Sequence, residues 1–405
     1  MPHPPEPSGR SIPSADAAVV AKSPKSRLAY IDMARVILIC GVIMIHAAAT
    51  YGAVGEWTFK DPNARDMFSG FLLSMLVICG QSFAMGLFFF IAGYFTAPSF
   101  DRKGVVSFWK GRLTHLAIPM ALYTWIFSRW PNYLDAVVNE GETGSLWRYS
   151  LRTFWRQADE GPTWFLFVLL AFSLGYTLIR MATERHRSGE QAWTKRVAPP
   201  PTPALIIVAV ALAAALFLIA QFINIIEQVD IFVIFSLLPA FFPGYILLFA
   251  AGILAYQNDW LARLPSKMNR FWGPLSVVWV VILPVFLLVS GAMKLGTDPY
   301  VKGSDWRCAL FCLWLGTACV AFSLSLILKL RERVAPQNRL AQWAGPNSYA
   351  VYIIHPLVLV PVCVWLSPFL IHPLIKFVAA SALAIPICFV LAEGLRRIPV
   401  VKKIF

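Results

Sequence analysis

Long apolar segments recur along most of the chain, and each is followed by a shorter polar or charged segment. A helix of about 20 apolar residues crosses a hydrocarbon core of about 30 Å and pairs its own backbone groups there. The pattern therefore predicts an all-α, polytopic integral membrane protein with about ten transmembrane helices. The predicted spans are residues 31–51, 69–97, 112–130, 163–182, 203–225, 231–256, 273–293, 306–329, 347–367 and 373–395.

Two connections between these spans differ from the rest. Between the fifth and sixth spans, the polar residues Glu227, Gln228 and Asp230 leave room only for a very short turn. Residues 131–162 form a long outer loop that holds Trp147, Arg148 and other aromatic and charged residues. This loop has two interpretations, an amphipathic helix lying in the membrane interface or a platform on which a polar acceptor such as a sugar docks.

Composition and charge support the membrane assignment. Of the 405 residues, 58% are hydrophobic and only 14% are charged, whereas soluble domains carry about 25% charged residues. The net charge is +14, and basic residues cluster in alternate connections and at both ends of the chain. Cytoplasmic loops retain Lys and Arg, so we expect both termini in the cytoplasm. The same distribution explains the positive charge without a nucleic acid as partner.

The ends of the chain flank the membrane domain. Residues 1–28 are rich in Pro, Ser and Ala and are predicted to form a disordered cytoplasmic tail. No apolar segment precedes Ile31, so we expect no cleavable signal peptide, with the first span acting as the insertion signal. Residues 29–397 are predicted as one transmembrane domain, and residues 398–405 as a cytoplasmic C-terminus.

The cysteines give no sign of a metal or redox site. There is no Cys-x-x-Cys motif and no Cys/His cluster with zinc spacing. We interpret all seven as small apolar packing residues, and we expect no metal and no permanently bound cofactor. They are Cys40, Cys79, Cys308, Cys312, Cys319, Cys363 and Cys388.

The first predicted span carries three ionisable residues, Asp32, Arg35 and His46. Arg35 and His46 are eleven positions apart, so they point to the same side of a helix and lie roughly 16 Å apart along its axis. Ionisable groups inside a span are costly and mark a functional site by default. The structural alternatives are a His bonded to a neighbouring helix and an Asp–Arg pair that begins the helix.

This pattern resembles the first helix of the membrane acyltransferase family 3, whose members O-acylate carbohydrates and other cell-surface molecules. The later motifs of the family follow in order over most of residues 27–395. Residues 87–95 resemble its Phe-Phe-x-x-Ser-Gly-Phe motif, with Ala92 in place of Ser. Residues 112–119 resemble its Arg-x-x-Arg-Leu-x-x-Pro motif, with Arg112 at the first Arg and His115 at the second.

Three further stretches extend the resemblance. Residues 161–167 contain Trp164 in a match to the family's Leu-Trp-Phe-Leu helix opening. Residues 242–256 resemble a later family helix, and residues 347–356 resemble its Ser-Tyr-x-x-Tyr-Leu-x-His motif through Tyr349 and His355. The second, third and sixth helices resemble the branch that modifies periplasmic glucans.

The resemblance implies an O-acyltransferase of the cell inner membrane. It implies transfer of an acetyl or succinyl group from cytoplasmic acyl-CoA to a hydroxyl group of a cell-surface or periplasmic glycan. In this hypothesis His46 is the catalytic base or acyl carrier. The other expected site residues are Arg35 and Asp32 for catalysis, and Arg112, Lys110 and His115 for donor binding. His355, Tyr349 and Trp164 are expected either to bind the acceptor or to hold the catalytic residues in place.

Two other functions remain open from the sequence. Ten helices with intramembrane ionisable residues also suit a secondary transporter with a proton or ion relay, although we find no paired half-repeats. A membrane scaffold is the third hypothesis, and it gives no role to Arg35 or His46.

Overall fold

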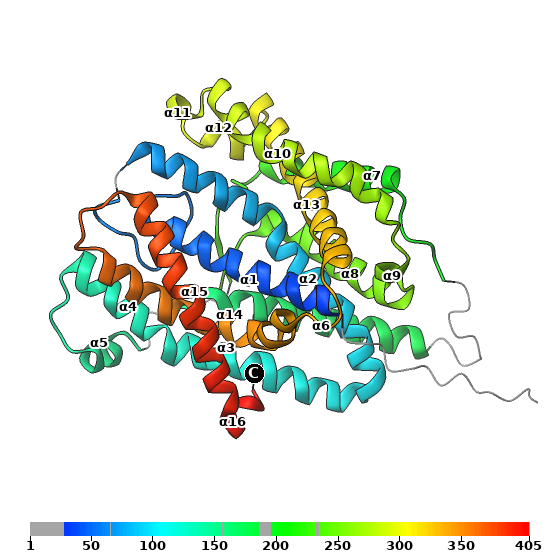
Figure 1. The fold of residues 1–405 in the computed structure, drawn as a ribbon, viewed down its shortest axis with the longest axis horizontal. Helices are drawn as coiled ribbons and strands as arrows, with labels where there is room; N and C mark the ends of the chain where they lie inside the picture. Colours follow the sequence, from blue (N-terminus) through cyan, green and yellow to red (C-terminus); the bar gives the residue numbers. More distant parts are fainter. Residues whose placement is uncertain (1–27, 65, 155–157, 186–195, 232–234, 405) are drawn as a thin grey trace, which may run out of the picture.

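The computed structural model describes residues 28–64, 66–154, 158–185, 196–231 and 235–404. The predicted disordered tail lies outside the described residues except for Leu28, and Phe405 lies outside them as well. The described residues are almost entirely helical, which confirms the all-α, polytopic architecture (Figure 1).

Nine helices in the described ranges are long and apolar enough to cross a membrane. They are α1 (Ala29–Thr50), the helical run Met67–Glu140 that begins with α2 (Met67–Arg112), α6 (Trp164–Arg185), α7 (Thr202–Ala220), α8 (Phe242–Gln257), α10 (Asn269–Val289), α13 (Trp306–Arg333), α14 (Arg339–Leu366) and α15 (Pro373–Arg397). The shorter helices are α5 (Leu146–Thr153), α9 (Trp260–Arg263), α11 (Ala292–Leu295), α12 (Asp298–Val301) and α16 (Pro399–Lys402).

The helical run Met67–Glu140 contains both the second and the third predicted spans. At about 1.5 Å per residue, its 74 residues would extend roughly 110 Å, far beyond one membrane crossing. The helix is interrupted at Gly104, whose φ of 69° and ψ of 172° lie outside the helical region and suit glycine. Nine helices thus account for about ten spans.

After α2 the run alternates between α-helix and π-helical turns. The order is η1 (Leu113–Ala117), α3 (Ile118–Leu122), η2 (Tyr123–Phe127), α4 (Arg129–Asp135) and η3 (Ala136–Glu140). Single π-helical turns are rare and often occur at functional sites. His115 lies in the first of them.

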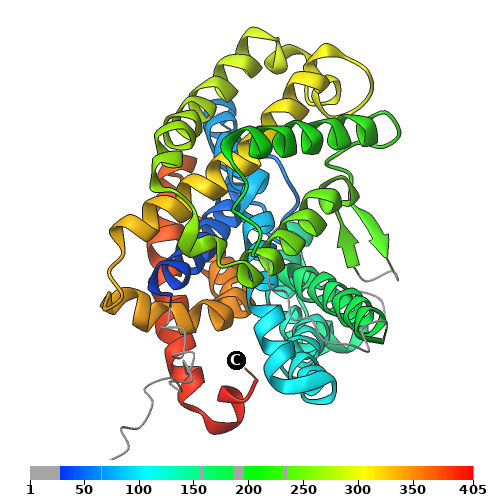
Figure 2. The ribbon, with the colours of Figure 1, turned by 90° about the vertical axis from the view of Figure 1, so that its right-hand side faces the viewer.

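The sixth span was predicted to begin at residue 231, and this is wrong. Strands β1 (Val229–Ile231) and β2 (Phe235–Leu237) instead form an antiparallel hairpin, at the edge of the molecule in Figure 2. The span begins only at Pro239, in a 3₁₀ turn that leads into α8. Pro239 disfavours helix at the residue before it, while the β-branched and aromatic residues of the segment suit strands.

The predicted outer loop at residues 131–162 is also shorter than expected, because helix continues to Glu140. Helix α5 lies in the remaining part, and its two sides differ. Tyr149 and Thr153 are buried, whereas Trp147 and Leu151 are 72% and 59% exposed. An exposed Trp and Leu one turn apart fit the interfacial interpretation of this loop better than the sugar-docking one.

Glycines let several long helices approach closely. A Cβ at Gly93 of α2 would collide with the carbonyl of Phe249 in α8, and a Cβ at Gly252 of α8 would collide with the carbonyl of Phe90. The aromatic run around Gly93 is therefore a helix-packing surface. At Gly345 of α14, a Cβ would lie 2.7 Å from the Cβ of Asp32, so α14 packs directly on α1.

Helices α1 and α14 run in the same direction through the centre of the molecule (Figure 1). Asp32 contacts Gly345 near the start of both helices, and His46 contacts His355 farther along both. Two odd-numbered predicted spans, the first and the ninth, should run parallel if every connection reverses the chain. The observed direction agrees with that expectation.

Helix α15 returns antiparallel to α14, so the start of α14 lies beside the end of α15. Asn347 near the start of α14 donates to Glu393 near the end of α15, with 3.0 Å between Nδ2 and Oε2. The carbonyl of Ile404 accepts a hydrogen bond from His115. We call this end of the bundle, which holds Asp32, Asn347 and Ile404, the terminal end. That it faces the cytoplasm stays a prediction.

Candidate active site

Three aromatic rings stack near the end of α1 that is remote from the terminal end. The imidazole of His46 lies parallel to the indole of Trp57, with 3.8 Å between ring centroids and 17° between planes. His355 of α14 lies 5.3 Å from His46 and 6.0 Å from Trp57, also nearly parallel to both. We call these residues the three-ring cluster. His46 therefore faces the interior of the bundle and not the surrounding lipid.

His355 has a fixed arrangement of protons when its ring is neutral. Its side chain is fully buried, and Nδ1 lies 2.8 Å from the carbonyl oxygen of Tyr352. A carbonyl only accepts, so Nδ1 carries the proton and donates it. The neutral ring then has a lone pair on Nε2, for which no partner occurs among the described residues. His355 thus has the form of a base whose orientation is set by its own helix.

Trp57 comes from the connection between α1 and α2, which we call the 51–66 loop. Its Nε1 is buried and has no hydrogen-bond partner within the described part of the chain. The sequence analysis missed this residue, because a Trp in a short polar connection is ordinarily read as an interfacial anchor. Trp57 could have been found from the sequence, because it follows the span that contains His46 by only a few residues.

Asp32 and Arg35 lie at the opposite end of α1 from His46. The Nη1 of Arg35 is 3.8 Å from the Oδ1 of Asp32, and their side chains are 32% and 13% exposed. Asp32 packs on Gly345, so Asp32 and His46 both face α14. Arg35 is within one turn of Asp32 and roughly 16 Å along the axis from His46. These residues are aligned along one helix but are not in contact with His46.

The predicted donor-binding residues gather at the terminal end. The Nη2 of Arg112 donates to the hydroxyl of Thr96 at 2.6 Å, and its guanidinium lies 4.9 Å from the ring centroid of Phe108. His115 follows one turn later and is exposed, and its Nδ1 is 3.0 Å from the carbonyl of Ile404. Lys110 is exposed.

Tyr349 belongs to this group rather than to the three-ring cluster. Its hydroxyl donates to the backbone carbonyl of His115 and so ties α14 to the π-helical turn η1. Next to His355 the structure places Tyr352, with 6.2 Å between ring centroids. The hydroxyl of Tyr352 donates to the carbonyl of Pro162. The sequence motif contains two tyrosines, and only Tyr349 was predicted as a site residue. The structure instead places the second, Tyr352, beside His355.

Trp164 also lies apart from the three-ring cluster. It begins α6, and its ring packs 6.1 Å from Tyr245 and 6.4 Å from Phe165. Phe165 in turn is 5.9 Å from Tyr352, the neighbour of His355. Trp164 is therefore connected to His355 only through a series of aromatic side chains.

A second polar group at the terminal end was not predicted. Asn347 is fully buried, and its amide oxygen accepts from Nη1 of Arg396 at 2.7 Å. Its Nδ2 donates to Glu393, as described above. The basic residues at the end of α15 were predicted only as a cytoplasmic flank. The contact of Asn347 with Glu393 and Arg396 was therefore not predicted.

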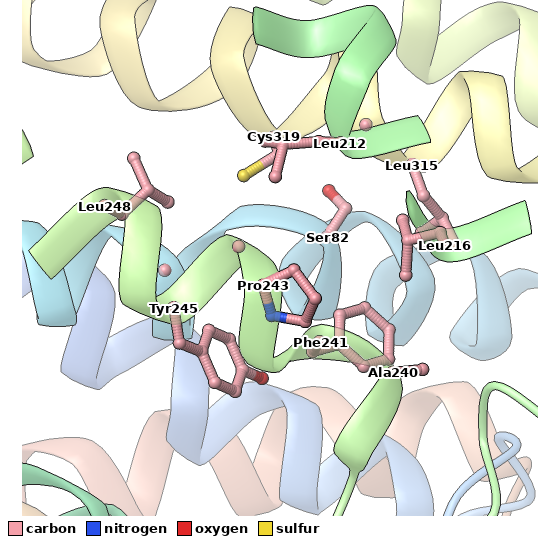
Figure 3. A pocket seen from close by; sticks show the side chains of 13 residues that line it. Ser82, Leu212, Leu216, Ala240, Phe241, Pro243, Tyr245, Leu248, Leu315 and Cys319 are labelled. Atoms are coloured by element: carbon pink, nitrogen blue, oxygen red, sulfur yellow. The ribbon is translucent and has the colours of Figure 1, made fainter. Parts of the chain in front are cut away.

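A narrow apolar crevice lies between α2, α7, α8 and α13 (Figure 3). It is lined mainly by leucines, glycines and aromatic residues, and Ser82, Cys319 and Tyr245 are its lining residues with polar or polarisable groups. Tyr245 lies at its edge and packs on Trp164. None of the predicted site residues lines it, so the crevice is separate from the three-ring cluster.

The described residues contain no group of three or more His, Cys, Asp or Glu side chains able to hold a metal ion. All seven cysteines are free thiols, and five of them are buried. They therefore belong to the packing of the helices.

The comparisons with known proteins point to one family. The model of acyltransferase family 3, described as an acyltransferase domain, matches residues 28–393. The match contains α1, the helical run Met67–Glu140, all later spans up to α14 and most of α15. Neither the curated proteins nor the solved structures that were searched include a match.

Proposed function

This chain belongs to the membrane acyltransferase family 3 and is a multi-pass membrane O-acyltransferase, and from that premise we propose that it acylates a glycan. The acyl group is acetyl or succinyl, and the donor is acyl-CoA reached from the cytoplasm. The acceptor is a hydroxyl group of a cell-surface or periplasmic glycan, and the protein resides in the cell inner membrane.

The reaction needs a base at the acceptor hydroxyl. In the proposed mechanism the hydroxyl oxygen attacks the thioester carbonyl carbon while an imidazole nitrogen of His46 takes the hydroxyl proton. The tetrahedral intermediate then collapses, the carbon–sulfur bond breaks, and CoA leaves as a thiol after the imidazole returns the proton. His355 lies beside His46, so a second imidazole is available to hold or pass that proton.

The observation that carries the proposal is the three-ring cluster in the interior of the bundle. Two imidazoles stacked within 5.3 Å, one of them with its Nδ1 proton fixed on a carbonyl, have no simple packing explanation. Buried polar side chains within a span ordinarily pair with one another or mark a functional pathway. The cluster supports proton transfer at this position.

The terminal end supports binding of the donor. Arg35 and Arg112 carry guanidinium groups, which bind phosphate through a rigid set of donors. Arg35 lies near the start of α1, roughly 16 Å along the helix axis from His46. Arg112 lies one turn before His115, which bonds to Ile404 at the terminal end. A CoA thioester with its phosphates at this end and its arm along α1 would bring the acyl group toward the three-ring cluster.

Membership of an acyltransferase family removes the basis for the transporter and scaffold hypotheses. The transporter hypothesis had relied on intramembrane ionisable residues with no assigned chemistry, and the scaffold hypothesis gave Arg35 and His46 no role. The alignment of Asp32, Arg35 and His46 on α1 is accounted for by acyl transfer.

The proposal is tested in cells that lack the native protein. Cells that express the wild-type chain, His46→Ala or His372→Ala are compared by mass spectrometry of base-released acyl groups on their surface glycans. We expect the wild type and the exposed His372→Ala control to restore ester content and His46→Ala to leave it at background. Ester content restored by His46→Ala would contradict the proposal.

A further inference from the structure

The three-ring cluster leaves one buried hydrogen-bond donor and one buried acceptor unpaired. The donor is the indole N–H of Trp57, and the acceptor is Nε2 of His355, since Nδ1 carries the proton that bonds to Tyr352. Both atoms are buried, and neither has a partner among the residues that the structure describes. Buried polar atoms without partners are rare in folded proteins, and each calls for an explanation.

The chemistry of these two atoms matches an alcohol. A hydroxyl group both donates and accepts, so it can satisfy an indole N–H and an imidazole lone pair together. A carboxylate only accepts and an ammonium group only donates, so each would leave one of the two atoms unpaired. A sugar hydroxyl fits this pair.

Trp57 is held in place by the loop that carries it. Phe59 of the 51–66 loop is fully buried, and the N–H of Asp61 donates to the carbonyl of Thr50 at 3.0 Å. Val54 donates through its N–H to the hydroxyl of Ser74 at 3.0 Å. The loop is thus attached to the end of α1 and to α2 on either side of Trp57.

A buried ion pair fixes the same loop to α15. The Nζ of Lys376 lies 2.6 Å from Oδ2 of Asp61, and the other carboxylate oxygen accepts from the hydroxyl of Ser367 at 3.0 Å. Lys376 also donates to the backbone carbonyl of Ser367 at 3.0 Å. Asp61 is only four residues from Trp57, so this pair helps to set where the indole lies.

We propose that Nε1 of Trp57 and Nε2 of His355 form the subsite that binds the reacting hydroxyl group of the acceptor, with Asp61 and Lys376 as positioning residues. The proposal rests on the proposed function. In it, Trp57 donates to the hydroxyl oxygen, and the hydroxyl donates to Nε2 of His355 while the acceptor is bound. The proton then goes to His46 as the oxygen attacks the thioester. The subsite selects an alcohol and holds its oxygen beside His46.

The test uses the full chain reconstituted in lipid nanodiscs. Radiolabelled acetyl-CoA and succinyl-CoA are the donors, and the acceptor is the glycan fraction extracted from cells that lack the protein. The KM for the glycan fraction and the KM for the donor are measured for the wild type, Trp57→Phe, and Trp306→Phe. Trp306 is 53% exposed at the start of α13, so it is a matched control for the same substitution.

Trp57→Phe keeps an aromatic ring on His46 but removes the N–H donor. One lost hydrogen bond predicts a rise in acceptor KM of about two- to tenfold, with the donor KM unchanged. Trp306→Phe should change neither value. An acceptor KM for Trp57→Phe equal to that of the wild type, or an equal rise in both KM values, would overturn the subsite. A wild-type protein that transfers no label to the glycan fraction would instead overturn the proposed function itself.

The positioning pair is tested by rescue. Lys376→Met leaves a buried carboxylate and should raise the acceptor KM without changing the donor KM. The double variant Asp61→Asn with Lys376→Gln keeps a hydrogen bond without the charges and should restore most of the loss. A folded Lys376→Met protein with wild-type acceptor KM would remove Asp61 and Lys376 from the proposal. If Lys376→Met does not fold, the double variant decides, since it predicts an acceptor KM near that of the wild type.

Discussion

Lys376 and Asp61 form an ion pair with 2.6 Å between Nζ and Oδ2, and their side chains are only 2% and 0% exposed. The pair connects α15 to the loop that carries Trp57. Charges removed from solvent are unfavourable unless they are paired and hydrogen-bonded, and here Ser367 and Asn63 complete the bonding of Asp61. The stability of this end of the bundle therefore depends on both members of the pair.

Removal of one member should destabilise the protein strongly. Lys376→Met leaves the carboxylate of Asp61 buried without its cation, at a cost of about 3–5 kcal/mol. Thermal unfolding of the detergent-solubilised protein should show a lower Tm, while Lys302→Met, at an exposed lysine, should leave the Tm unchanged. Equal Tm values for the two variants would show that the ion pair does not contribute to stability.

The contact between α2 and α8 depends on glycine. Gly252→Ala would place a Cβ against the backbone of Phe90, where neither helix has a flexible side chain to move. We expect a loss of about 1–3 kcal/mol in the free energy of unfolding, as found for overpacked cores.

Gly394→Ala is the matched control for that substitution, because a Cβ at this position in α15 meets no atom within 4 Å. An alanine in an open helix position should be neutral or slightly stabilising. Chemical denaturation in detergent measures both variants. A Gly252→Ala protein as stable as Gly394→Ala would contradict the close approach of α2 and α8.

Glu160 should make stability depend on pH in an unusual direction. Its side chain is 7% exposed, and burial raises the pKa of its carboxyl group above the ordinary value of 4.5. The folded state then binds the proton more tightly than the unfolded state. The contribution of Glu160 to stability is complete below the unfolded pKa and is lost as the pH rises through the folded pKa.

Glu160→Gln isolates this effect, since the amide oxygen can still accept from the N–H of Ser236. The variant should be more stable than the wild type at neutral pH, and the difference in Tm should shrink as the pH falls toward 4.5 and below. Scans of both proteins over the same pH series check the sign. A difference in Tm that grows toward low pH would mean that folding lowers the pKa of Glu160 instead of raising it.

The two histidines should behave as one catalytic unit. His355→Ala removes the second imidazole from the three-ring cluster, and we expect a loss of acyl transfer of about 10²–10⁴-fold, similar to His46→Ala. Residues that act together give non-additive losses, so the double variant should be little worse than either single variant. Transfer rates in nanodiscs measure this. A loss for the double variant equal to the product of the two single losses would indicate independent roles.

Apolar periodicity was sufficient to predict the helical class and about ten spans, because lipid requires each crossing segment to pair its own backbone. It failed at residues 229–238, where a short apolar stretch forms a hairpin, since hydropathy does not distinguish a buried strand from a helix start. The charged residues between the second and third spans suggested a loop. In the described run Met67–Glu140 the helix is instead interrupted there only at Gly104, which hydropathy could not show.

The candidate site was predictable in part. Asp32, Arg35 and His46 stood out because ionisable residues within a span are rare, and His355 stood out through its motif. Trp57, Asp61 and Lys376 did not, because their role depends on contacts between residues about 10 to 315 positions apart along the chain. Trp57 reads as an interfacial anchor, and Lys376 as a flanking charge at the start of a span, until the loop is seen folded over His46.

We propose that an acyl group enters at the terminal end and reaches a hydroxyl beside His46 near the opposite end. It is tested most directly in proteoliposomes of known orientation, with labelled acyl-CoA on one side and the extracted glycan fraction on the other. We expect labelled glycan only when acyl-CoA is on the side of residues 28 and 404, and none with His46→Ala. Transfer by His46→Ala at the wild-type rate, or transfer only from the opposite side, would contradict it.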